Sequence, residues 1–137
     1  IHGKTWENHR SSLGSAQVRP PVGPKGFLRA CREAAVVLGM SETHELPLYF
    51  SNRIWLTLAS GAFHLTHYVP RMEELFTAGE HLDWFRGPEE CLEKVADYLA
   101  RPLDRVRIAS RGQELVLARH TYLHRVQELF QALDSQA

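Results

Sequence analysis

Three polar residues with binding chemistry, Ser51, Asn52 and Arg53, stand at the start of a short helical pattern. A guanidinium such as that of Arg53 can hold a phosphate with two hydrogen bonds, and the start of a helix adds backbone N–H donors beside it. The helix behind them is expected to end at Gly61 in a left-handed cap, and a buried strand over 62–65 follows. Such junctions in parallel sheets lie beside the crevice where ligands bind, so the stretch predicts an anion or sugar site.

A second interpretation of Arg53 is equally open at this stage. The guanidinium could instead form a surface salt bridge with Glu45 or Glu74.

Elsewhere, Gly3-Lys4-Thr5 matches only the tail of a phosphate-binding loop and lacks the preceding glycine at the required spacing. Arg53 is therefore the better phosphate candidate.

The eight histidines raise the question of a metal site. His120 and His124 stand four apart on a predicted helix, which lets two imidazoles share an ion, but no third ligand follows. His64 and His67 bracket the end of a predicted strand, where ligand contacts gather, although a hydrogen-bonded wall role is the more common one there. We predict structural roles for most of these side chains and no metal site.

No catalytic residue can be assigned from the motifs. The chain has no G-x-S-x-G nucleophile elbow, and Cys31 and Cys91 fall on helix faces that should be buried. The acidic residues of segment 73–83 offer no demonstrable pair for acid and base catalysis, so most should be solvated.

Composition narrows the class of protein. The chain has 137 residues, 44% of them hydrophobic, with sixteen basic and sixteen acidic side chains and no formal net charge. One domain with one core is expected, and non-specific binding to nucleic acid or anionic membranes is not. Two dispersed cysteines favour free thiols in a reducing cytoplasm, and no apolar stretch is long enough to span a membrane.

Periodicity predicts an α/β fold: a single Rossmann-like domain with a small parallel sheet flanked by helices and followed by C-terminal helices. The chain opens with a long loop over 7–25, rich in Gly, Pro and Ser, and has no internal repeat. The expected helices cover 26–33, 51–60, a turn within 69–77, 88–100, 103–118 and a last segment from Thr121; the expected strands cover 34–38, 62–65 and 81–85.

The segment 26–130 resembles the C-terminal half of glycosyltransferases of the spore-maturation CgeB type, bacterial enzymes of the group 1 clan with the GT-B fold. The most specific part of the likeness is its closing pattern. That pattern is Arg-x-x-Ile-Ala-x-x-Gly, which ends at Gly112, followed by His120-Thr121-Tyr122-x-x-Arg125. The turn formed by His2-Gly3 and Trp6 is similar to the glycine and tryptophan turn after the first strand of that half.

The resemblance implies a donor-binding domain that takes a nucleotide-diphosphate sugar, with the N-terminal acceptor-binding domain missing. It implies a hexosyl transferase that is inactive as this fragment alone. It implies no cofactor and no required metal. The resemblance implies no nucleic-acid partner and no membrane span. The implied substrate-binding residues are Gly3, Trp6, Ser51, Asn52, Arg53, Ser60, Gly61 and His67.

One position departs from the family pattern. Related enzymes usually carry a glutamate that holds the ribose hydroxyls in the segment Arg-x-x-Glu-x-x-Ala-x-Gly, and this chain has Leu56 there. A leucine accepts no hydrogen bond. The alternative function is therefore a non-catalytic nucleotide- or protein-binding module of the same fold.

Overall fold

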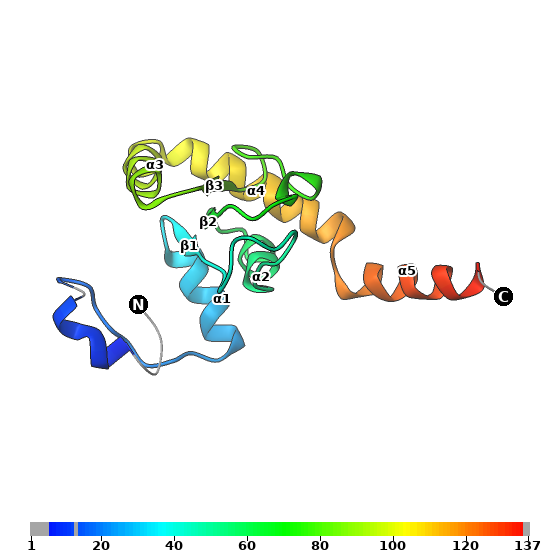
Figure 1. The fold of residues 1–137 in the computed structure, drawn as a ribbon, viewed down its shortest axis with the longest axis horizontal. Helices are drawn as coiled ribbons and strands as arrows, with labels where there is room; N and C mark the ends of the chain where they lie inside the picture. The colour runs from blue at the N-terminus through cyan, green and yellow to red at the C-terminus, as the bar shows by residue number, and fades with distance from the viewer. Residues whose placement is uncertain (1–5, 13, 136–137) are drawn as a thin grey trace.

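Three short parallel strands form the sheet of the computed structural model, which describes residues 6–12 and 14–135 (Figure 1). They are β1 (Val37–Gly39), β2 (His64–His67) and β3 (Asp83–Phe85), in the order β1-β2-β3. Val37 pairs with His64 and Gly39 with Thr66, so the carboxyl ends of β1 and β2 lie side by side. Parallel strands need crossover connections, and these place the helices on the faces of the sheet.

Helices make up most of the remaining chain, and several begin at a proline. Proline suits the first turn of a helix because the N–H that it lacks would have no intrahelical partner there. The helices are α1 (Pro24–Glu33), α2 (Arg53–Ala59), α3 (Pro88–Ala100), α4 (Pro102–Arg119) and α5 (Tyr122–Asp134), with the 3-10 helices η1 (Trp6–Ser12) and η2 (Met72–Glu74).

Two clusters of buried side chains form the core, and α4 contributes to both. Val116 packs with the cluster around Leu58 of α2, and Ile108 packs with the cluster around Leu65 of β2. Gly112 lies between them, and a Cβ there would collide with the carbonyl oxygen of His81. The glycine that closes the first part of the family-like pattern is thus required for the close approach of α4.

Several predicted elements are confirmed, and with them the α/β class. Helices begin at Pro88 and directly after Thr121, and the break at Arg101-Pro102 separates α3 from α4. Gly61 adopts a left-handed φ of 75°, as its predicted role in capping α2 requires. None of the helices in the described part of the chain is long and apolar enough to cross a membrane.

Other predictions were wrong in detail. The strand expected to be buried over 34–38 is β1, which starts at Val37 and lies at the edge of the sheet, where Leu38 is 56% exposed. The expected loop over 7–25 contains most of η1 and the start of α1. By contrast, the helical turn predicted within 69–77 is confirmed as the short η2. Both cysteines are free as predicted, but Cys91 is only half-buried.

Candidate functional site

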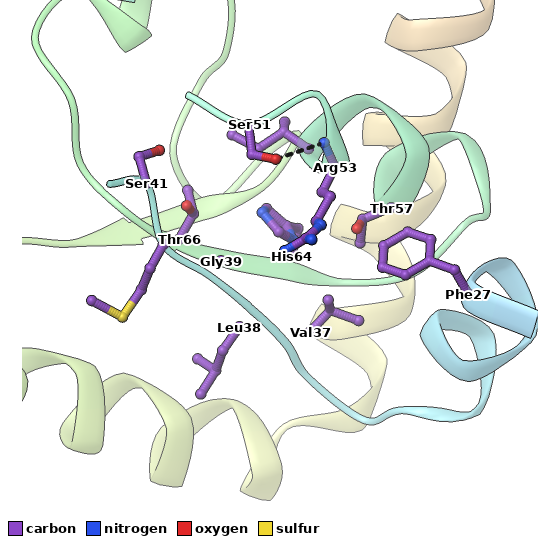
Figure 2. Close-up of a pocket in the computed structure, with 12 residues that line it drawn as sticks. Phe27, Val37, Leu38, Gly39, Ser41, Ser51, Arg53, Thr57, His64 and Thr66 are labelled. Atoms are coloured by element: carbon purple, nitrogen blue, oxygen red, sulfur yellow. Dashed lines mark hydrogen bonds between the residues drawn. The ribbon is translucent and has the colours of Figure 1, made fainter. Parts of the chain in front are cut away.

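A cavity of about 150 Å³ lies along β1 and β2, beside α2, and reaches past the carboxyl end of β1 to Ser41 (Figure 2). We call it the strand-end cavity. Its polar side chains come from β2, α2 and the segment 40–52 that connects β1 to α2. The lining residues are Phe27, Val37, Leu38, Gly39, Met40, Ser41, Ser51, Arg53, Ile54, Thr57, His64 and Thr66.

His64 is the most unusual residue of this cavity. Its side chain is only 2% exposed, and neither ring nitrogen has a hydrogen-bond partner. Burial lowers the pKa of His64 to about 4, so the ring is neutral at pH 7, with one N–H donor and one acceptor nitrogen. Buried polar groups are nearly always hydrogen-bonded, so two unpartnered nitrogens at a cavity indicate a place for a ligand atom or a water.

Gly39 is what allows this imidazole to lie against β1. A Cβ at Gly39 would come within 2.5 Å of His64 Nε2 and 2.8 Å of Thr66 Oγ1. Both contacts are far shorter than ordinary van der Waals distances, so a larger residue would displace the ring. The backbone of β1 therefore forms one wall of the strand-end cavity at Gly39.

Arg53 supplies the positive charge at the cavity. Figure 2 shows its side chain directed toward the region of His64, while its backbone N–H donates to Ser51 Oγ at 3.3 Å. Among the residues that the structure describes, no carboxylate forms an ion pair with Arg53. Glu74, one of the two predicted partners, instead accepts a 2.9 Å hydrogen bond from Arg71. The salt-bridge interpretation of Arg53 is therefore not supported.

The helix behind Arg53 contributes less than the sequence suggested. α2 has seven residues, and Asn52 at its N-cap has helical φ and ψ and makes no side-chain capping bond. Two turns of helix align few peptide dipoles, so the macrodipole is small. The affinity of this region for an anion must come from the guanidinium itself.

The structure does not bring all the predicted binding residues together. Ser51 and Arg53 line the strand-end cavity, whereas Asn52 faces a different pocket on the other side of α2. Ser60 and Gly61 lie at the opposite end of the helix. There the Ser60 hydroxyl donates to Thr57 O at 2.6 Å, and the Ser60 carbonyl accepts a 3.0 Å bond from Arg32. These contacts give Ser60 a structural role.

His67 also lies apart from the cavity. The His67 ring stacks on His44 with centroids 3.5 Å apart, and its Nδ1 lies 2.8 Å from the carbonyl oxygen of Tyr68. This stack ties the segment between β1 and α2 to the end of β2. Trp6 is the first residue of η1. Gly3 lies outside the described residues.

The paired histidines of the closing pattern have different surroundings. His124 Nδ1 lies 2.7 Å from the Thr121 hydroxyl and forms a capping box at the start of α5. His120 instead stacks on Trp55 of α2. Across the described part of the chain, no group of three or more His, Cys, Asp or Glu side chains could hold a metal ion.

Sequence reasoning missed part of the cavity wall. Thr57 and Thr66 are both buried there, and Gly39 was expected only to end a strand. A glycine directly after a strand was the available signal, because glycine often marks a close approach of backbone to another group.

Comparison with known proteins places the chain in a family. A model of the family described as "Glycosyl transferase-like" matches residues 1–131. The chain belongs to this glycosyl transferase-like family. No curated protein matches the chain.

A solved structure supports the fold. The chain is similar to the C-terminal domain of a glycosyl transferase group 1 family protein (LpcC) from Francisella tularensis, with a TM-score of 0.60 and 14% sequence identity. The match covers 85% of this chain and 60% of that one. At this identity the likeness shows a shared architecture, while binding residues have to be argued from the cavity itself.

Proposed function

We propose that this domain binds the nucleotide-diphosphate sugar donor of a glycosyltransferase, with the phosphates and sugar at the strand-end cavity. The observation that carries the proposal is His64, a buried imidazole with two unpartnered nitrogens that lines the same cavity as Arg53. Family membership supplies the reaction class, transfer of a glycosyl group.

The two side chains suit the two parts of such a donor. Glycosyl transfer leaves a nucleoside diphosphate whose negative charge must be stabilised as the bond breaks, and the Arg53 guanidinium can do this without a metal ion. A neutral imidazole can both donate and accept a hydrogen bond, as a sugar hydroxyl also can. His64 therefore fits the sugar and Arg53 fits the diphosphate.

A complete glycosyl transfer also needs a site for the acceptor. The chain spans 60% of the C-terminal domain to which it is similar. We propose that a separate N-terminal domain binds the acceptor, that a hexosyl group is transferred between them, and that the present 137 residues bind donor without turning it over.

Calorimetric titration with UDP, GDP and their sugars tests donor binding. Replacing Arg53 by alanine should weaken binding of the nucleoside diphosphate at least tenfold, because a hydrogen bond to a charged group contributes about 1.5–3 kcal/mol. The melting temperature should not change, since the Arg53 side chain is exposed.

Arg29→Ala is the matched control, because Arg29 is an exposed arginine whose side chain lies 3.8 Å from Glu33 on α1. It should leave every dissociation constant unchanged. Failure of the unmodified protein to bind any of these compounds at millimolar concentration would rule out the proposal.

A second function has one observation in its favour. Leu56 occupies the position of the usual ribose-binding glutamate, and its side chain is 43% exposed. A non-catalytic binding module of the same fold would have no need for that carboxylate. Such a module would bind no nucleotide sugar in the titration above.

A further inference from the structure

A second pocket, of about 300 Å³, lies between α2 and the junction of α4 with α5. It is built largely from rings, and we call it the aromatic pocket. Its lining residues are Asn52, Trp55, Leu56, His120, Tyr122 and Arg125. Three of these belong to the closing pattern 120–125, and none of those three lines the strand-end cavity.

The rings of the aromatic pocket differ in how much of their surface is available. Trp55 and His120 stack on each other with centroids 4.8 Å apart and planes 27° apart, and Trp55 also packs against Phe76. Tyr122, the first residue of α5, is 86% exposed, so its ring is available for stacking. Tyrosine and tryptophan faces bind planar rings by stacking, and the exposed Leu56 adds an apolar contact.

The polar groups of the pocket favour a neutral ring with hydrogen-bonding edges over an anion. Arg125 already donates to the Arg119 carbonyl at 2.7 Å and pairs with Glu128 at 3.0 Å, so its charge is largely compensated. Asn52 makes no capping bond with its side chain, and its amide offers one acceptor and two donor hydrogens. The edge of a nucleobase presents the complementary groups.

The two pockets flank the same helix. Residues 53, 54 and 57 of α2 face the strand-end cavity, while 55 and 56 face the aromatic pocket, on opposite sides of a helix with 3.6 residues per turn. Asn52 of one pocket is the chain neighbour of Arg53 of the other. The two pockets therefore adjoin at the start of α2.

We propose that the aromatic pocket binds the nucleobase of the sugar donor, stacked against Tyr122. This inference rests on the proposed function and adds the place of the base to it. Leu56 adds an apolar contact to this pocket.

Three probes separate the two ends of the donor: UDP or GDP, the corresponding free nucleoside, and inorganic pyrophosphate. Tyr122→Ala should weaken binding of the nucleoside diphosphate and the nucleoside about tenfold, as loss of one base stack does, and leave pyrophosphate binding unchanged. Arg53→Ala should weaken binding of pyrophosphate and nucleoside diphosphate but not of nucleoside.

Tyr122→Phe keeps the ring and should retain most of the affinity. Leu123→Ala, at the neighbouring exposed position of α5, should change none of the three constants. Melting curves of each variant exclude unfolding as the cause of a loss.

If Tyr122→Ala binds the nucleoside diphosphate as tightly as the unmodified protein while Arg53→Ala does not, the base lies elsewhere and this inference fails, although the donor proposal stands. If the unmodified protein binds none of the three probes, both fail. A change of oligomeric state in Tyr122→Ala with unchanged affinities would assign the pocket to a protein contact and also overturn the inference.

Discussion

At the scale of single residues, the strand-end cavity depends on an imidazole kept out of water. His64 pairs in register with Val37, and the absence of a side chain at Gly39 leaves room for its ring. Burial makes protonation costly, because the charged ring would lose its hydration without gaining a partner. The neutral His64 that suits a sugar hydroxyl is thus also a source of pH-dependent stability.

The pKa of His64 falls from about 6.5 in the unfolded chain to about 4 in the folded one. Between these values the unfolded state binds a proton that the folded state does not, so stability rises with pH across this window and is complete above pH 6.5. The contribution is about 3 kcal/mol. The free energy of unfolding of the unmodified protein, measured by urea denaturation, should lose most of this contribution between pH 7 and pH 4.

His64→Phe removes the titrating group and keeps an aromatic ring of similar size. The variant should lack this part of the pH dependence, while His120, whose pKa burial also lowers, titrates in both proteins. Parallel stability curves for the two proteins from pH 7 to pH 4 would show that His64 is not the group responsible.

The residues of the strand-end cavity were only partly predictable. Ser51 and Arg53 could be chosen because a polar cluster before a helical pattern is visible in the sequence. The unpartnered state of His64 could not, because it depends on which residue of a distant strand lies opposite. The same limit applies to the aromatic pocket, where Trp55 and Tyr122 are brought together by the packing of α2 against the end of α4.

At the scale of elements, α3 is joined to β3 by a cluster of buried polar groups. Asp83 is buried and accepts hydrogen bonds from the Trp84 N–H at 2.8 Å, from Lys94 at 3.1 Å and from the Tyr98 hydroxyl at 2.8 Å. Burial, together with the hydrogen bond to Asp83, raises the pKa of Tyr98 well above its usual value. These contacts fix the first three turns of α3 against the outer strand.

Replacing Lys94 by methionine should destabilise the domain by about 2 kcal/mol. The substitution keeps the apolar stem of the side chain but removes the only cation that pairs with Asp83 in the described residues, and a buried carboxylate without its counter-ion is costly. Because Lys94 is partly exposed, the loss stays below that of a fully buried pair. Urea denaturation at pH 7 measures it, and an equal stability of Lys94→Met and the exposed control Lys25→Met would contradict the prediction.

The elements themselves were predictable in proportion to their length and their local signals. α3, α4 and α5 carry proline or threonine at the start and apolar residues at helical spacing, so their bounds follow from local chemistry. β1 has three residues and lies at the edge of the sheet. Its sequence therefore shows little alternation of apolar and polar residues from which a strand could be predicted. Its place was set by pairing with β2, which no local signal reveals.

At the scale of the whole molecule, the domain divides into a packed body and a projecting helix. α5 extends away from the sheet and its covering helices (Figure 1), and none of its residues is buried. Its apolar side chains nonetheless recur at helical spacing. The exposed ones are Leu123, Val126, Leu129, Phe130 and Leu133. The pattern predicted the helix correctly, but an apolar stripe does not say what covers it.

Removing residues 127–137 should therefore change the free energy of unfolding of the body by less than about 1 kcal/mol, because the deleted part of α5 contributes no buried side chain to the core. Tyr122 and Arg125 remain, so the aromatic pocket keeps its lining. Urea denaturation at pH 7 compares the free energies of unfolding of the two chains. A loss of several kcal/mol would show that the last turns of α5 pack on the body in solution, and the projecting arrangement would then be wrong.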